Sequence, residues 1–168
     1  MEELKYHYMY PHPSVTTDCV IFGFDGTRLN VLLIERGIEP YKGRWAFPGG
    51  FLKMDETALM GAKRELFEET GFTIPEGVEI HEIGKVPYQT NKSLWLFSAV
   101  VPGLDEAVKK MKCNSFFTDS FGNRKSETDS FILVRDARAF FKNMQPHVFN
   151  EIERRNQQLI NMKVEDFK

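Results

Sequence analysis

The strongest chemical signal in this sequence is a group of three glutamates, Glu65, Glu68 and Glu69. On an α-helix their side chains share an arc of about 100°. Ala62 and Leu66 fall beside that arc, so the carboxylates border the stripe that such a helix buries. Like charges placed so closely repel, and partial burial adds a desolvation cost. Carboxylate oxygens are ligands for Mg²⁺, Mn²⁺ or Ca²⁺. The pattern therefore favours a divalent-cation site, and the alternative is a solvated acidic face.

The residues around these glutamates have a defined spacing, which separates the two interpretations. The stretch reads Gly50-x5-Glu56-x7-Arg64-Glu65-Leu66-x-Glu68-Glu69-x-Gly71-Phe72. At every defined position this stretch resembles the signature of the Nudix family. A chance match to so many fixed identities is rare at ordinary residue usage. The resemblance covers 23 residues directly.

The resemblance implies a fold and an activity. Nudix proteins are α/β proteins, with an α/β/α sandwich around a mixed central β-sheet. Family members hydrolyse the pyrophosphate bond of a nucleoside diphosphate linked to another moiety, and they use Mg²⁺ or Mn²⁺. The implied partner of this chain is therefore a small nucleotide substrate.

Roles for individual residues follow from the same resemblance. The carbonyl group of Gly49 and the carboxylates of Glu65 and Glu69 are expected to be metal ligands. Glu68 is expected to be a ligand or the base that activates water. Arg64 is expected to orient Glu68. Glu56 is expected to support the corner between the glycine-rich loop and the helix, or to bind a further metal.

Other candidate site residues lie outside the helix. Some family members take the general base from a downstream loop, and Glu127 is the best candidate here; its alternative is a charged hairpin loop. Tyr41 and Phe51 flank the glycine-rich segment, and each is a candidate platform for a nucleotide base. Arg44 is a candidate phosphate contact, and Gly50 a candidate contact for substrate.

A second layer of resemblance lies upstream, in Thr17–Phe22, Leu32–Gly37 and Pro40–Gly50. These segments are similar to the ADP-ribose pyrophosphatase branch and to Nudix-related repressors that bind ADP-ribose-type ligands. ADP-ribose or a nucleotide sugar is therefore the expected substrate type. Two alternatives stay open: a hydrolase of nucleoside triphosphates with a house-cleaning role, and a non-catalytic nucleotide sensor.

Composition bounds the remaining possibilities. The chain has 168 residues, 42% of them hydrophobic, and a formal net charge of −2. We expect a Tyr- and Pro-rich N-terminal arm at residues 1–13 and a single domain at 14–168. The charge balance does not favour a nucleic-acid partner. Cys19 and Cys113 form no paired motif, and no apolar run is long enough to span a membrane. A cytoplasmic protein is expected, and the arm could serve a homodimer.

The elements that must position these residues follow from periodicity and turn signals. Strands are predicted at Val15–Phe24 and Asn30–Glu35, forming a hairpin in a core sheet. A helix is predicted from about Glu56 to Thr70, with Asp55 as N-cap and Gly71 after its end. The other predicted elements are strands at Trp45–Phe47, Val78–Val86 and Ser93–Val101, a short helix at Leu104–Met111, a hairpin of Phe116–Phe121 with Asp129–Val134, and helices at Asp136–Met144 and from Pro146 to about Asn161.

Overall fold

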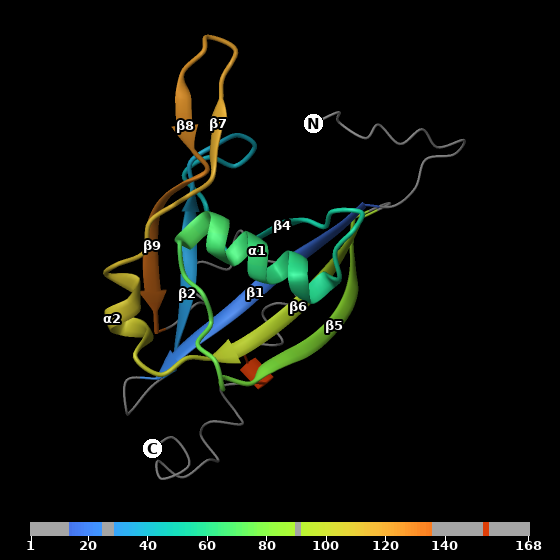
Figure 1. Cartoon of the computed structure of the whole chain (residues 1–168), viewed down its shortest axis with the longest axis vertical. Coiled ribbons are helices and arrows are strands. Elements are labelled where there is room, and N and C mark those ends of the chain that lie inside the picture. Colours follow the sequence, from blue (N-terminus) through green and yellow to red (C-terminus); the bar gives the residue numbers. More distant parts are fainter. Residues whose placement is uncertain (1–13, 25–28, 90–91, 136–152, 155–168) are drawn as a thin grey trace, which may run out of the picture.

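The computed structural model describes residues 14–24, 29–89, 92–135 and 153–154. Within them, seven strands form one mixed sheet: β1 (Ser14–Phe24), β2 (Leu29–Arg36), β3 (Trp45–Ala46), β4 (Gly49–Phe51), β5 (Ile80–Gln89), β6 (Lys92–Val100) and β9 (Thr128–Val134). Two short strands, β7 (Phe116–Thr118) and β8 (Arg124–Ser126), form a separate hairpin. The helices are α1 (Ala58–Thr70) and α2 (Leu104–Val108). Figure 1 shows α1 lying across the sheet and the β7–β8 hairpin projecting from it.

The central pair of the sheet is β1 and β6, which run parallel, while the other strand pairs are antiparallel. The expected α/β fold with a mixed sheet is therefore confirmed. The predicted pairing of the first two strands is also confirmed, with Phe22 opposite Val31. Strand β1 pairs with β2 at its end and with β4 near its beginning, so β4 enters beside β1 at the level of Thr16–Asp18.

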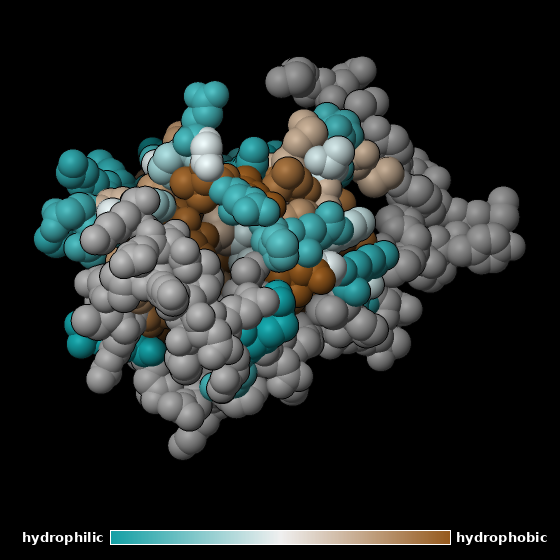
Figure 2. All heavy atoms as spheres, turned by 90° about the horizontal axis from the view of Figure 1, so that it is seen from below, coloured by the Kyte–Doolittle hydropathy of each residue, from teal (hydrophilic) through white to brown (hydrophobic). Residues whose placement is uncertain are grey.

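The core has two layers because β1 and β2 are buried on both faces. On one face Cys19 and Ile21 pack with Ala62 and Leu66 of α1 and with Leu104 of α2. On the other face a second cluster contains Val20, Phe22, Leu33, Phe47, Leu94 and Leu96. Both described helices therefore lie on the same face of the sheet, and α1 is anchored there by its apolar stripe. Figure 2 views the molecule from below and shows hydrophobic residues lying between hydrophilic ones.

Helix α1 begins two residues later than predicted. Thr57, not Asp55, is the N-cap, and its side chain accepts a hydrogen bond from the amide of Met60 at 3.2 Å. Glu56 therefore stays outside the helix, where its carboxylate accepts a hydrogen bond from the amide of Lys53 at 2.8 Å. The predicted end is confirmed: Gly71 has φ 69° and donates to the carbonyl of Phe67. The left-handed backbone conformation after the end of a helix favours glycine, because glycine has no Cβ atom to oppose it.

The predicted second hairpin is wrong in its pairing. Strand β7 pairs with β8, and β9 leaves the hairpin to pair with β2. The carboxylate of Asp119 closes the tighter turn by accepting from the amides of Phe121 and Asn123, both at 2.9 Å. The apolar stretch Phe131–Val134 is then free to add to the main sheet, where Val134 joins the core.

Three smaller boundaries also differ from the predictions. Strand β3 ends at Ala46, and α2 ends at Val108. Strand β5 continues through Pro87, which an edge strand of the sheet tolerates because it lacks a second neighbour. The predicted arm at residues 1–13 and the predicted helix at Asp136–Met144 lie outside the described residues. Of the last predicted helix only residues 153–154 are described, and both are helical. Among the described helices none is long and apolar enough to cross a membrane.

Candidate active site

The glycine-rich segment packs directly against the acidic helix. Strand β4 pairs with β1 so that Gly49 lies opposite Asp18 and Gly50 opposite Thr17. A Cβ atom at Gly50 would lie 2.5 Å from the carboxyl carbon of Glu65, and one at Gly49 would collide with the Asp18 carboxyl. Both positions therefore require glycine because two carboxylates approach the backbone of β4 closely. The segment forms the floor of the site.

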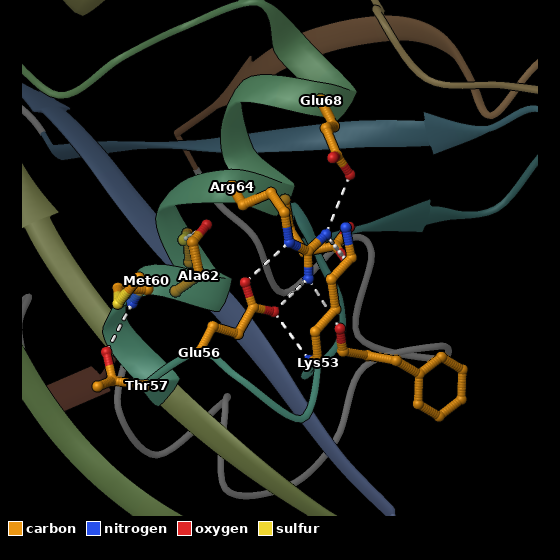
Figure 3. Close-up of polar contacts among 10 residues, drawn as sticks. Lys53, Glu56, Thr57, Met60, Ala62, Arg64 and Glu68 are labelled. Atoms are coloured by element: carbon orange, nitrogen blue, oxygen red, sulfur yellow. Dashed lines mark hydrogen bonds and ion pairs between the residues drawn. The ribbon is translucent and has the colours of Figure 1, made fainter. Parts of the chain in front are cut away.

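Arg64 connects the acidic residues to one another. Its guanidinium binds both carboxylate oxygens of Glu56, at 2.7 and 3.0 Å. It also binds Glu65 at 2.7 Å, Glu68 at 3.0 Å and the carbonyl of Phe51 at 2.9 Å. Figure 3 shows Glu56 and Glu68 reaching Arg64 from different sides. The fork geometry of arginine suits such multiple recognition. The predicted pairing of Arg64 with Glu68 is present, whereas its bidentate contact with Glu56 was not predicted.

The pKa values around Arg64 respond to these contacts. Its hydrogen bonds hold the pKa of Glu56 below the usual value, and the Glu56 contact in turn raises the pKa of Arg64. Glu65 behaves differently, because burial outweighs its bond to Arg64 and raises its pKa. A buried carboxylate that keeps a raised pKa beside an arginine is short of positive charge.

Glu69 is the most buried of the three helix glutamates, at 6% exposure. Its carboxylate accepts a hydrogen bond from the amide of Gly49 at 2.8 Å. Burial raises its pKa well above the usual value, and the charges of Glu65, Asp18 and Glu127 raise it further. Glu69 therefore ties the helix to the glycine segment while contributing negative charge to the site.

Two carboxylates from other elements join this group. Glu127, between β8 and β9, is half-buried, and its charge raises the pKa values of both Glu65 and Glu69. Its backbone is held by hydrogen bonds to Gly37 at 2.9 Å and to Ser115 at 3.0 Å. The structure thus brings this predicted residue to the cluster, although it lies far away in sequence.

Asp18 is a further carboxylate whose pKa is coupled to this group, and the sequence predicted no role for it. Desolvation raises its pKa to about 7, and Glu65 adds to the rise while Lys92 and Arg36 oppose it. The available signal was one carboxylate in the otherwise apolar and hydroxyl-bearing strand Val15–Phe22. Sequence spacing could not reveal that β1 pairs with the glycine segment.

The predicted substrate contacts lie on two separate segments, strand β4 and the loop between β2 and β3. Phe51 is 61% exposed, with the Lys92 ammonium 5.1 Å from the centre of its ring, and its carbonyl touches the site through Arg64. Tyr41 is 55% exposed in the loop between β2 and β3, where the Arg44 guanidinium lies 5.3 Å from its ring centre. Phe51 is therefore at the edge of the acidic cluster, while Tyr41 and Arg44 contact each other in the loop between β2 and β3.

The donor chemistry of the cluster fits a hard divalent cation. All candidate donors are oxygens, burial and then neighbouring carboxylates raise the pKa values of Glu65 and Glu69, and the glycine backbone lies against them. Within the described residues no three acidic, histidine or cysteine side chains converge tightly enough to form a ready metal site. Arg64 instead holds Glu65 and Glu68 through the same nitrogen.

Comparisons with known proteins agree with this geometry. Residues 12–111 match the NUDIX domain. The chain is 42% identical over 77 residues to the ADPR responsive transcriptional repressor NtrR of Acinetobacter baylyi, which covers 45% of this chain and 31% of that protein. It is 41% identical over 69 residues to the ADP-ribose pyrophosphatase of Methanocaldococcus jannaschii, covering 41% of this chain and 38% of that one. The chain therefore spans about a third of the length of these two curated relatives.

A solved structure supports the same fold. The NUDIX domain of Shewanella oneidensis NrtR, complexed with ADP ribose, superposes with a TM-score of 0.66 at 19% sequence identity. The match covers 89% of this chain and 90% of that one. At this identity the likeness concerns the fold. Together with the matched domain, the acidic helix and its glycine floor, it shows that the chain belongs to the NUDIX domain family.

Proposed function

We propose that this chain hydrolyses the pyrophosphate bond of a nucleoside diphosphate linked to a second moiety, of the ADP-ribose or nucleotide-sugar type, with Mg²⁺ or Mn²⁺. The observation that carries the proposal is the group of Glu65, Glu68 and Glu69 beside the glycine segment. Arg64 holds the first two, and the Gly49 amide holds the third. The similarity to an ADP-ribose pyrophosphatase supports the substrate type.

The oxygen donors proposed to hold the cation are the carbonyl of Gly49 and the carboxylates of Glu65, Glu68 and Glu69. A divalent cation supplies neutralisation of pyrophosphate charge and a lowered pKa for water. The chain supplies the positions of the groups: the Gly49 amide fixes Glu69, and Arg64 fixes Glu65 and Glu68. Fixed groups of this kind contribute to rate because they need no rearrangement in the transition state.

A carboxylate must accept the proton of the attacking water. Glu68 is proposed for this role because its side chain is 38% exposed, more than those of Glu65 and Glu56 at 13% and 9%. Glu127 is the second candidate, since its backbone is anchored and its charge reaches Glu65 and Glu69. Phe51 is proposed to stack on the base, and Tyr41, Arg44 and Gly50 to contact other parts of the substrate.

A second candidate function is nucleotide sensing without hydrolysis. The observation that favours it is the similarity to a protein named as an ADPR responsive transcriptional repressor. A small nucleotide ligand fits both functions. Three further statements remain predictions from the sequence: a possible homodimer, a cytoplasmic location and the absence of a nucleic-acid partner.

A hydrolysis panel with Mg²⁺ and with Mn²⁺ tests the proposal. The panel contains ADP-ribose, nucleotide sugars, NADH, dinucleoside polyphosphates and nucleoside triphosphates, with products resolved by ion-exchange chromatography. We expect AMP and a sugar phosphate from ADP-ribose. Pyrophosphate from a triphosphate would instead support a house-cleaning role, and nucleotide binding without any product would support the sensor.

Substituted proteins identify the proton acceptor. Glu68→Gln should lower the rate by about 10²–10⁴ if Glu68 is the general base. Glu127→Gln should do so if the second candidate is correct. Glu79→Gln is the matched control, because that side chain is 89% exposed and lies outside the cluster. Full activity of both Glu68→Gln and Glu127→Gln would contradict the proposed mechanism.

A further inference from the structure

Two buried side-chain hydroxyls have no hydrogen-bond partner in the described part of the chain, those of Thr17 and Thr128. Thr128 lies at the start of β9, opposite Arg36. Thr17 is fully buried in β1. A buried hydroxyl without a partner is costly in a folded protein, and such groups are rare in native structures. The position of Thr17 therefore requires an explanation.

The strand register places the Thr17 side chain on the same face as Glu65. Thr17 is paired with Gly50, and paired residues of neighbouring strands project to the same side of a sheet. A Cβ atom at Gly50 would meet the Glu65 carboxyl, so that carboxyl occupies the space above Gly50 on this face. Cys19, two residues further along β1, confirms the direction, because its thiol donates to the carbonyl of Ala62 in α1. An unused donor thus lies beside a carboxylate.

The Glu65 carboxylate has acceptor capacity left for such a donor. The bond from Arg64 to its Oε1 atom is the one side-chain hydrogen bond that the described structure assigns to it. A carboxylate can accept about four hydrogen bonds.

We propose that the Thr17 hydroxyl is a positioning donor for the Glu65 carboxylate in the cation-bound site. Arg64 now shares one nitrogen between Glu65 and Glu68. With a divalent cation bound to the Glu65 carboxylate, the Thr17 hydroxyl would donate to that carboxylate and hold it in its ligand orientation. Ligand-orienting partners of this kind are ordinarily worth about 10–100-fold in metal affinity. The inference rests on the proposed use of a divalent cation.

The test compares Thr17→Val with wild type by two measurements made on the full chain. Without divalent cations, Thr17→Val should raise the thermal midpoint by about 2–4 °C, because it removes a buried hydroxyl that lacks a partner. With Mn²⁺, followed by electron paramagnetic resonance of the free ion, the variant should bind about 10-fold more weakly. A merely structural role would not weaken Mn²⁺ binding in a protein that has become more stable.

Two further variants complete the experiment. Thr17→Ser keeps the hydroxyl and should restore most of the Mn²⁺ affinity. Thr16→Val is the matched control, because Thr16 is the neighbouring buried threonine on the opposite face of β1 and its hydroxyl already donates to the carbonyl of Ser93. It should leave Mn²⁺ affinity unchanged.

Wild-type affinity for Mn²⁺ in Thr17→Val would overturn the inference, and so would a loss in Thr17→Ser equal to that in Thr17→Val. An absence of Mn²⁺ binding by wild type would overturn it as well. The outcome is separate from the hydrolysis panel: wild type that binds Mn²⁺ through Thr17 and cleaves no substrate refutes the proposed hydrolysis while supporting the role of Thr17.

Discussion

Replacement of Arg64 by methionine tests whether its guanidinium is the main compensation for the acidic cluster. Five hydrogen bonds from this side chain would be lost. Methionine keeps the length of the side chain and removes its charge. The Glu56 and Glu65 side chains, only 9% and 13% exposed, would lose their cationic partner. Glu68, at 38%, would remain solvated and lose little.

The expected loss of unfolding free energy is about 3–5 kcal/mol, the usual cost of removing one partner from a buried ion pair. For a domain of this size that corresponds to a fall of roughly 6–20 °C in the thermal midpoint. Arg64→Lys should lose less, about 1–2 kcal/mol, because the charge remains while the forked contact with Glu56 disappears. Lys63→Met is the matched control, since Lys63 is an exposed neighbour on the same helix.

The loss should depend on pH. Arg64 lowers the pKa of Glu56, so its contribution is present above the unfolded pKa of a glutamate and disappears as the pH falls. Glu65 acts in the same direction, because without Arg64 its ionised form would be penalised further and protonation would relieve it. The difference between wild type and Arg64→Met should therefore be largest near neutral pH and shrink toward about pH 4.

Urea denaturation in EDTA, at about pH 7.5 and about pH 4.5, measures both quantities. EDTA removes adventitious cations that would otherwise compensate the carboxylates left without Arg64. A loss below about 1 kcal/mol at neutral pH would refute the reasoning, because a surface ion pair is worth that much. A loss that is the same at both pH values would refute it too, since the carboxylates would then not be the groups that Arg64 stabilises.

Three further predictions concern the surroundings of this cluster. Asp18→Asn should stabilise the cation-free protein, because burial raises the Asp18 pKa to about 7 and ionised Asp18 therefore destabilises the fold. The gain in unfolding free energy should grow from about pH 4 to about pH 7 and reach at most about 4 kcal/mol above pH 7. Urea titrations that give the same gain at both pH values would contradict this. Phe51→Ala should raise KM for the nucleotide about 5–50-fold with an unchanged thermal midpoint, because the ring is exposed; steady-state kinetics showing an unchanged KM would exclude stacking. The amide of Asn123 and the other donors lower the pKa of Asp119 to about 2. Acidification from about pH 4 toward pH 2 should therefore loosen the β7–β8 turn and speed amide hydrogen exchange at Phe121 and Asn123. Exchange that stays slow at pH 2 would contradict this.

Local sequence patterns predicted those features of the structure that depend on a single element or a single strand pair. The apolar runs in β1 and β2 predicted a buried hairpin, and the glycine after α1 predicted the end of that helix. The spacing of Glu65, Glu68 and Glu69 predicted a shared face next to the buried stripe. These features depend on backbone geometry and helical period, which neighbouring residues determine.

The boundaries that were wrong depend on competition between local and distant partners. The N-cap is Thr57 and not Asp55 because the Glu56 side chain binds Arg64, eight residues further along, and stays outside the helix. Strand β9 left the predicted hairpin because Asp119 closes a shorter turn and β2 offers an apolar edge. The missing side chain of Gly61 likewise matters only in the folded chain, where it makes room for Leu52 and Glu56.

The sequence by itself determined which helix carries the chemistry, because seven spaced identities and a helical period place the glutamates together. Only the tertiary structure decided how their charge is compensated. The parallel pairing of β1 with β6 and the entry of β4 beside β1 bring Asp18 and Thr17 next to the glycine segment. The path from β8 to β9 brings Glu127 toward the same carboxylates. These neighbours are distant in the chain, and burial gives their charges a strength that no local pattern encodes.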